Sequence, residues 1–245
     1  MQIYPIFIGY DPRQNLSYNV LCSSITVRAS APIAIVPLKL ETLPLQRSGL
    51  TPFTFSRFLV PHIVGFQGAA LFLDSDMLCL GDIVELFDMA LPQFKAGKAA
   101  CVVKNKEKFE WAALIMFNCS HPKNRVLTPD YVEHAEKLHW LGWLDDEDIG
   151  EFPAEWSHTV MYDEPRADPK LVHYTGGIPV FPETVGCEHT EAYHREMTIM
   201  GSIQPWPTLM GRSVHAKRVM EFAKQRGPWP QTQQLGVEGR EASHA

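Results

Sequence analysis

Short apolar runs alternate along the chain with segments whose apolar residues recur at helical spacing. Buried strands are predicted at residues 3–9, 33–38, 69–73, 99–103, 112–117 and 171–173. Helices are predicted after the Asp11-Pro12 cap, at residues 56–61, in a short segment after the Asp82 cap that carries Ile83, Leu86 and Phe87, and at residues 129–140, 189–200 and 213–224.

The order of these elements indicates the fold class. The chain opens strand–helix–strand, which is typical of a parallel sheet with right-handed crossovers. We therefore expect an α/β fold, with a mixed, mostly parallel sheet flanked by helices. Residues 1–225 contain no linker-like stretch and are expected to form one domain. Residues 226–245 are rich in Gly, Pro, Gln and Glu, and we expect this tail to be disordered.

Composition narrows the classes of partner and compartment. The 245 residues carry 22 Lys and Arg against 28 Asp and Glu, so the net charge of −6 argues against nucleic acid as a partner. Five widely spaced cysteines form no C-x-x-C pair, which is typical of a reducing compartment. The first residues lack a basic segment and a cleavage site, and no apolar run approaches the length of a membrane span. We expect a cytoplasmic protein without a transmembrane segment.

The sharpest chemical motif follows the apolar strand at 69–73. Asp74 and Asp76 flank Ser75, so on a straight strand both carboxylates point to one face. The carboxyl end of a strand is where open α/β sheets bind ligands. Two carboxylates there can hold a hard divalent cation such as Mg²⁺ or Mn²⁺, and the cation can bridge two phosphates. The alternative is a loop in which both acids face solvent.

A second motif follows the short strand at 171–173. His173 can offer an imidazole nitrogen to the same cation, and Gly176-Gly177 would let a backbone loop approach phosphates closely. Taken alone, this histidine is more simply a hydrogen-bonded structural residue. The other histidines show no ligand spacing; His134 and His139, for instance, lie five apart and not four.

Four segments, taken in their order along the chain, resemble glycosyltransferase family 8, the GT-A-fold sugar transferases related to glycogenin and bacterial galactosyltransferases. The segments are Ile6-Phe7-Ile8-Gly9-Tyr10-Asp11, Phe55-Ser56-Arg57-Phe58-Leu59-Val60-Pro61, the Asp-x-Asp segment at 71–77 with the helix after it, and His173-x-x-Gly176. The ordered set spans residues 3 to about 182 and is far more specific than any one of its members.

The resemblance implies a site and a reaction. Asp74, Asp76 and His173 would hold Mn²⁺ or Mg²⁺, and Gly9, Tyr10, Asp11, Ser75, Gly176 and Gly177 would line the donor site. Arg57 would add a permanent cation for phosphates or ribose; its alternative is a surface ion pair. Tyr10 could stack on a base and Asp11 could accept from uracil, although Asp11 is equally well explained as a helix cap. The implied reaction transfers a sugar from a nucleotide sugar, expected to be a UDP-sugar, with retention to a saccharide, lipid or protein acceptor.

The chain also departs from the family pattern. The closing motif continues as Gly177-Ile178-Pro179-Val180-Phe181, without the family's lysine and tryptophan, and the strand at 112–117 lacks the leading asparagine. The family's Asp-Gln-Asp motif has only a loose counterpart at 145–148, which we interpret first as an exposed loop and second as acceptor contacts. Trp140 and Trp143 are interpreted as core or interface residues before an acceptor surface.

Three alternatives stay open. A non-catalytic protein that binds a nucleotide sugar would explain the missing lysine and asparagine. A phosphatase with an aspartate nucleophile also places Asp-x-Asp after a strand, but usually near the N-terminus and with Thr or Val two residues further on. A nucleotidyltransferase would begin with a Gly-rich basic loop, which Gly9-Tyr10-Asp11-Pro12 is not.

Overall fold

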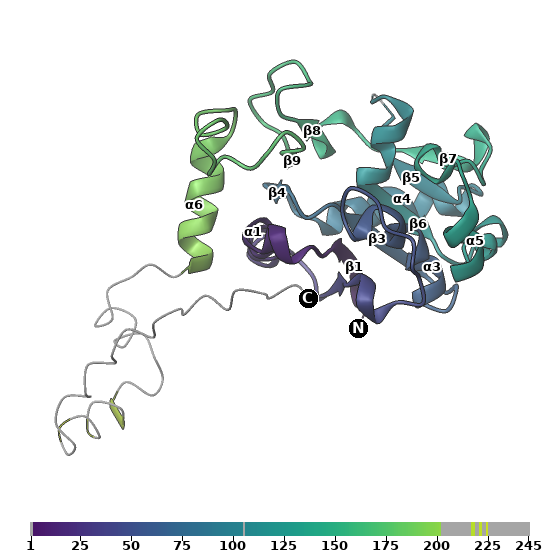
Figure 1. Ribbon diagram of the computed structural model, residues 1–245, viewed down its shortest axis with the longest axis horizontal. Coiled ribbons are helices and arrows are strands. Elements are labelled where there is room, and N and C mark those ends of the chain that lie inside the picture. Colours follow the sequence, from purple (N-terminus) through teal and green to yellow (C-terminus); the bar gives the residue numbers. More distant parts are fainter. Residues whose placement is uncertain (1, 105, 202–216, 219–220, 222–223, 225–245) are drawn as a thin grey trace, which may run out of the picture. The chain divides into compact units, whose positions relative to one another are not determined.

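The computed structural model describes residues 2–104, 106–201, 217–218, 221 and 224 (Figure 1). Met1–Gly201 form one compact unit and Ser202–Ala245 belong to a second. Of the helix predicted at 213–224, the four described residues, Lys217, Arg218, Glu221 and Lys224, are helical. The predicted tail at 226–245 lies outside the described residues.

A six-stranded mixed sheet forms the centre of the first unit. Its strand order is β2-β1-β3-β6-β5-β7, and β6 is antiparallel to both of its neighbours while the pairs β1–β2, β1–β3 and β5–β7 are parallel. The α/β fold with a mostly parallel sheet is thus confirmed. The bounds are β1 Tyr4–Gly9, β2 Ile33–Leu38, β3 Ala69–Leu73, β5 Ala100–Val102, β6 Leu114–Asn118 and β7 Ile149–Glu151.

Alternating side chains build one core on each face of this sheet. Ile6 and Ile8 of β1 pack on one face with helices α1 (Asn15–Thr26) and α4 (Val84–Lys95). Phe7 packs on the other face, beneath α2 (Phe53–Ser56), α3 (Val60–Ile63) and α5 (Pro129–His134). Because the side-chain period of a strand is two, a continuous apolar run such as that of β1 is required when both faces are covered.

A small second sheet carries the chain away from the end of β3. Its order is β4-β9-β8, with bounds β4 Met77–Cys79, β9 Leu171–His173 and β8 His158–Thr159. Strand β4 begins only four residues after β3 ends, and it pairs antiparallel with β9. Helix α6 (Thr190–Gly201) lies beside α1, where Arg28 and Glu196 form an ion pair of 2.8 Å.

The prediction of one long helix at residues 129–140 is wrong. Helix α5 starts where Thr128 caps it and ends at His134; Ala135 is extended, and Leu138–Trp140 form a separate 3₁₀ turn. The reason is tertiary, because the Arg47 side chain donates to the carbonyls of Val132 and Ala135 at 3.0 and 2.6 Å. An external donor thus satisfies carbonyl groups at the helix end that further helical turns would otherwise bond.

Two other boundaries differ from expectation. The helix after Asp82 is not short, since α4 runs for 12 residues, and the Asp82 carboxylate accepts a bond from the Val84 amide as predicted for a cap. The strand predicted at 112–117 starts two residues later, because Lys108–Ala113 are 3₁₀-helical. Within the described residues, no helix combines the length and the apolar character needed to cross a membrane.

Candidate active site

The strand pairing brings the two predicted motifs together. Asp74 and Asp76 lie in the short connection between β3 and β4, and Met77 of β4 is paired with His173 of β9. This register places His173 Nε2 3.3 Å from Asp76 Oδ1 and 4.0 Å from Asp74 Oδ2. One ligand atom from each of the three residues lies within 4.8 Å of the other two. We call this group the carboxylate cluster.

The carboxylate cluster has the properties of a cation site. The side chains of Asp74, Asp76 and His173 are 13, 21 and 4% exposed. Asp76 Oδ1 is buried with His173 Nε2 3.3 Å away, and His173 Nδ1 is buried without a hydrogen-bond partner in the described part of the chain. The Ser75 hydroxyl donates to the Gln14 side chain at 2.8 Å. Two carboxylates and an imidazole that converge with little exposure fit a bound divalent ion.

The ionisation of the three groups is strongly coupled. Burial raises the pKa of Asp74 to about 6, although the Arg57 charge opposes the shift and Asp76 adds to it. Burial also acts to raise the pKa of Asp76, but the His173 charge and hydrogen bonding outweigh it, so this pKa is lowered. For His173, burial is outweighed by the charges of Asp76 and Asp74, so its pKa is raised. A nearby cation favours the ionised carboxylates.

Arg57 lies against the cluster and not on the surface. Its Nη1 is 2.9 Å from Asp74 Oδ1 and also donates to the Ala112 carbonyl at 2.7 Å. The guanidinium lies 4.9 Å from the Phe72 ring centre, and the residue is 6% exposed. The structure thus gives Arg57 the task of holding Asp74 in place, while its predicted contact with phosphates stays a prediction.

A pocket of about 270 Å³ opens beside the cluster. Asp76 lies in its wall, and Gly177 lies there with a φ of +119°, a backbone conformation that side chains disfavour. Gly176 is not part of the lining. The lining residues are Arg13, Gln14, Leu16, Ser17, Asp76, Tyr174, Thr175, Gly177, Ile178, Val180 and Phe181.

The predicted base-binding residues at the end of β1 have structural contacts. A side chain on Gly9 would meet the Phe53 ring at 2.3 Å, so only glycine permits this close approach. Tyr10 packs edge-on against Tyr18 with ring centres 5.3 Å apart. Asp11 is buried and accepts from the Arg13 amide at 2.9 Å, which confirms its predicted role as a cap. A hydrogen bond from Arg13 holds the pKa of Asp11 below its usual range.

Arg13 is the residue that the sequence interpretation missed. It is the cation among the described residues lining the pocket, and its side chain is 69% exposed while paired with Asp11 at 2.6 Å. The available signal was its position, because residues just after the first strand lie at the sheet's carboxyl edge. Its charge could replace that of the family's missing lysine.

The acidic run at 145–148 is held by lysines. Lys123 bonds Asp145 at 2.7 Å and Asp148 at 2.6 Å, and Lys108 bonds Asp146 at 2.6 Å. Trp143 is partly buried against Phe58, with ring centres 5.7 Å apart, whereas Trp140 is 49% exposed. These contacts give the acidic run and Trp143 structural roles, and an acceptor contact stays a prediction.

Comparison with known proteins places the chain in a family. No protein-family model matches the chain. Protein CDI of Arabidopsis thaliana is 36% identical over 224 residues, which cover 79% of this chain and 86% of the relative. The chain belongs to the family of Protein CDI. Glycosyltransferase 8 domain-containing protein 1 of Homo sapiens is 37% identical over 62 residues, covering 25% of this chain and 16% of the relative.

Solved structures share the fold of this member of the CDI family. The glycosyltransferase GlyE of Streptococcus pneumoniae TIGR4 matches with a TM-score of 0.58 and 13% identity, over 96% of this chain and 66% of GlyE. The galactosyltransferase LgtC matches with a TM-score of 0.54 and 13% identity, over 82% of this chain and 96% of LgtC. The bifunctional WbbM has a TM-score of 0.58 and 13% identity; the match covers 89% of this chain and about half, 51%, of WbbM. The predicted resemblance to glycosyltransferase family 8 is thus confirmed at the level of the fold.

Proposed function

We propose that this protein is a glycosyltransferase that moves a sugar from a nucleotide-sugar donor to an acceptor, with a divalent metal held by Asp74, Asp76 and His173. The observation that carries the proposal is the convergence of Asp74 and Asp76, from the β3–β4 connection, with His173 of β9 beside a pocket that Asp76 lines. The shared glycosyltransferase fold supports the same reaction class.

The ligand set bears on the identity of the metal. Two carboxylates suit Mg²⁺ and Mn²⁺ alike, whereas an imidazole nitrogen is a softer ligand that Mg²⁺ rarely accepts. The set of Asp74, Asp76 and His173 therefore favours Mn²⁺. The donor that we propose is a UDP-sugar, and the acceptor class is a saccharide, a lipid or a protein.

The pocket residues can divide the work of the reaction. When bound, the metal supplies Lewis-acid stabilisation of the charge that develops on the departing diphosphate. Arg13, which lines the same pocket, is exposed and would turn from Asp11 toward the diphosphate. Arg57 fixes the Asp74 carboxylate through its 2.9 Å contact, so that this ligand is positioned before the metal binds. The resemblance implies transfer with retention at the anomeric carbon.

One observation favours a second candidate, a non-catalytic protein that binds a nucleotide sugar. Arg57 is engaged by Asp74 and backbone carbonyls, so it offers no free charge to the phosphates in this arrangement. The two candidates share every binding property and differ only in turnover.

The test incubates the full chain with Mn²⁺ and a panel of nucleotide sugars and measures release of the nucleoside diphosphate. We expect release with at least one UDP-sugar, and its loss in Asp76→Asn. Asp130→Asn is the matched control, because Asp130 is 95% exposed on α5. Binding without release across the panel and a range of acceptors would favour the non-catalytic candidate.

A further inference from the structure

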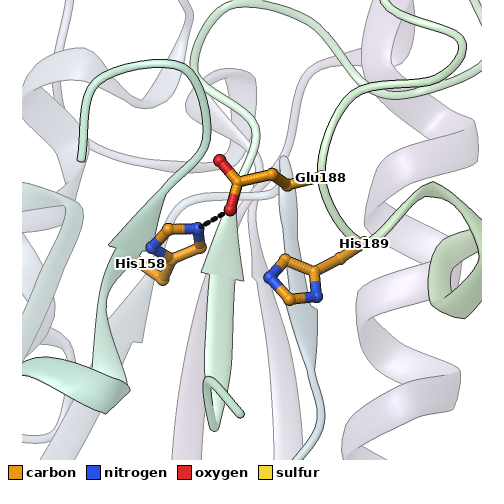
Figure 2. A group of neighbouring side chains, drawn as sticks. All are labelled: His158, Glu188 and His189. Carbon is orange, nitrogen blue, oxygen red and sulfur yellow. Dashed lines mark hydrogen bonds and ion pairs between the residues drawn. The ribbon is translucent and has the colours of Figure 1, made fainter. Parts of the chain in front are cut away.

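A second group of ligand-type side chains lies away from the pocket wall. His158 of β8 is 1% exposed, and its Nε2 is 3.1 Å from Glu188 Oε2. His189 follows Glu188 directly, just before α6, and one ligand atom from each of the three residues lies within 4.8 Å of the others. Figure 2 shows the Glu188 carboxylate and the two imidazole rings converging from two separate segments. We call this group the imidazole cluster.

The imidazole cluster contains one buried and two partly buried side chains, and one buried nitrogen in it has no partner. The hydrogen bond between His158 and Glu188 satisfies those two residues, but His189 Nε2 is buried with no hydrogen-bond partner in the described part of the chain. His189 also has a φ of +58°, which is uncommon for a residue other than glycine. This backbone conformation presents the ring toward β8, so a local strain accompanies the convergence of the side chains.

The distances suit a tetrahedral ion. Zn–N bonds of about 2.0–2.1 Å place neighbouring ligand atoms about 3.3 Å apart. The separation of 3.1 Å between His158 Nε2 and Glu188 Oε2 is close to this value, and the ligand atoms of the group lie within 4.8 Å of one another, so a side-chain shift of about 1.5 Å closes the site. Two imidazoles and one carboxylate form a ligand set that binds zinc with the fourth position open.

A carboxylate lies near the imidazole cluster, and two pockets reach its residues. Asp163 Oδ2 lies 3.8 Å from the other ring nitrogen, His158 Nδ1, and it also accepts a bond from the Thr159 amide at 2.6 Å. Asp163 also pairs with Lys106, and a small shift toward His158 would give the carboxylate–imidazole arrangement usual around a ligating histidine. One pocket of about 220 Å³ includes His158, and another of about 390 Å³ includes Glu188 and His189, so an ion can enter.

We propose that His158, Glu188 and His189 form a zinc site, distinct from the carboxylate cluster, that joins β8 to the start of α6. The site encloses the segment from β9 to α6. That segment supplies Gly177, Ile178 and Phe181 to the pocket wall. Zinc binding therefore restrains the wall of the pocket. The zinc site stands without the proposed function, whereas an effect of zinc on donor binding rests on it.

The test measures zinc binding to the full chain, stripped of metal, in an Asp76→Asn background that disables the carboxylate cluster. We expect one equivalent of Zn²⁺, and Co²⁺ should show the visible absorption of a tetrahedral site. Loss of a supporting carboxylate behind a histidine costs about 10–100-fold in metal affinity. The loss of zinc affinity in Asp163→Asn should fall in that range, and His189→Ala should weaken zinc binding at least as much.

Further variants keep the proposal falsifiable. Glu188→Gln should weaken zinc binding even if His189→Ala fails to fold, which circular dichroism would reveal. His134→Ala is the matched control, because its ring is 74% exposed on α5. Hydrogen exchange of residues 175–189 should slow on adding Zn²⁺. The proposal would be overturned if the Glu188→Gln and His189→Ala proteins bound zinc as tightly as His134→Ala. It would also be overturned if the Asp76→Asn protein bound no zinc, and His158 and Glu188 would then be only a hydrogen-bonded pair. Neither result bears on turnover with UDP-sugars.

Discussion

The carboxylate cluster and the imidazole cluster are two three-residue groups with opposite composition. The first has two carboxylates and one imidazole beside a buried arginine, whereas the second has two imidazoles and one carboxylate. The first lies where a central strand ends, at the wall of a pocket. The second joins a two-residue strand to the start of a helix.

The difference in composition bears on which metal we propose for each cluster. Oxygen-rich ligands suit hard cations that exchange and that carry phosphates, while imidazoles suit zinc. Arg57 balances part of the negative charge at the carboxylate cluster, so Asp74 is held in place without a metal. In the described part of the first unit Glu188 pairs with His158 and with no arginine or lysine, so we expect the imidazole cluster to depend more on its ion.

The largest expected effect comes from Asp76→Asn. The change is nearly isosteric but removes a charge from a site for a doubly positive ion, so turnover should fall at least about 100-fold. Zinc at the imidazole cluster should be unaffected. Steady-state kinetics and zinc analysis of the same sample test both statements. Equal loss of turnover in Asp130→Asn would contradict the assignment.

The next largest effect separates the roles of two arginines near the same pocket, Arg57 and Arg13. Arg57→Gln should lower the free energy of unfolding by about 3 kcal/mol, because it leaves the Asp74 carboxylate buried without its partner. Arg13→Gln should cost less stability than Arg57→Gln, since buried Asp11 would keep the Arg13 backbone amide as a donor, yet it should weaken UDP binding. Urea unfolding and UDP titration separate the two roles. A destabilised Arg13→Gln protein with normal UDP affinity would reverse them.

A histidine outside both clusters tests how burial without a neighbouring carboxylate affects an imidazole. His139 packs edge-on against Phe55 and Phe58, and burial, with the charges of Arg57 and Arg47, lowers its pKa to about 4. A lowered histidine pKa gives stability that is present above about pH 6.5 and is lost as the pH falls toward 4. Between pH 7 and 5 this loss amounts to about 2 kcal/mol.

The matched variants are His139→Leu and His134→Leu. Urea unfolding at pH 7 and pH 5 should show that His139→Leu removes most of this acid-dependent loss. His134→Leu should retain it, since His134 is exposed. If both variants lose the same stability on acidification as the unchanged protein, His139 is not the responsible group.

The smallest effect lies in the segment between the two clusters. Gly177→Ala forces a side chain into a φ of +119° and should cost about 1–2 kcal/mol. Gly176→Ala should cost less, because its added carbon meets only Met161 Sδ at an ordinary 3.6 Å. Thermal unfolding compares the pair, and a larger loss for Gly176→Ala would show that the segment is held differently.

The sequence could predict the carboxylate cluster because its signals are local. An apolar strand, two carboxylates two residues apart and a histidine at the end of another short strand each stand out in one window. The approach of His173 to Asp76 depends on the β4–β9 pairing, which no local sequence pattern predicts; the family resemblance implied only that the two residues share a metal. Arg57 could be found as a residue but not as a buried partner of Asp74, because that contact crosses from the 3₁₀ turn after α2 to the end of β3.

The imidazole cluster could not be predicted, for a physical reason. His158 lies 30 residues before Glu188, and no periodic pattern joins them. Their approach depends on the β8–β9 pairing and on the turn at His189 that precedes α6. The end of α5 escaped prediction in the same way, because Arg47, a residue distant in the sequence, satisfies its carbonyls.

The most direct test of the central claim is calorimetric titration of UDP into the full chain with Mn²⁺ and with a chelator. If Asp74, Asp76 and His173 hold the metal that carries the diphosphate, UDP should bind at least about tenfold more tightly with Mn²⁺, and Asp76→Asn should abolish the difference. Equal UDP affinity with and without the chelator would contradict the account.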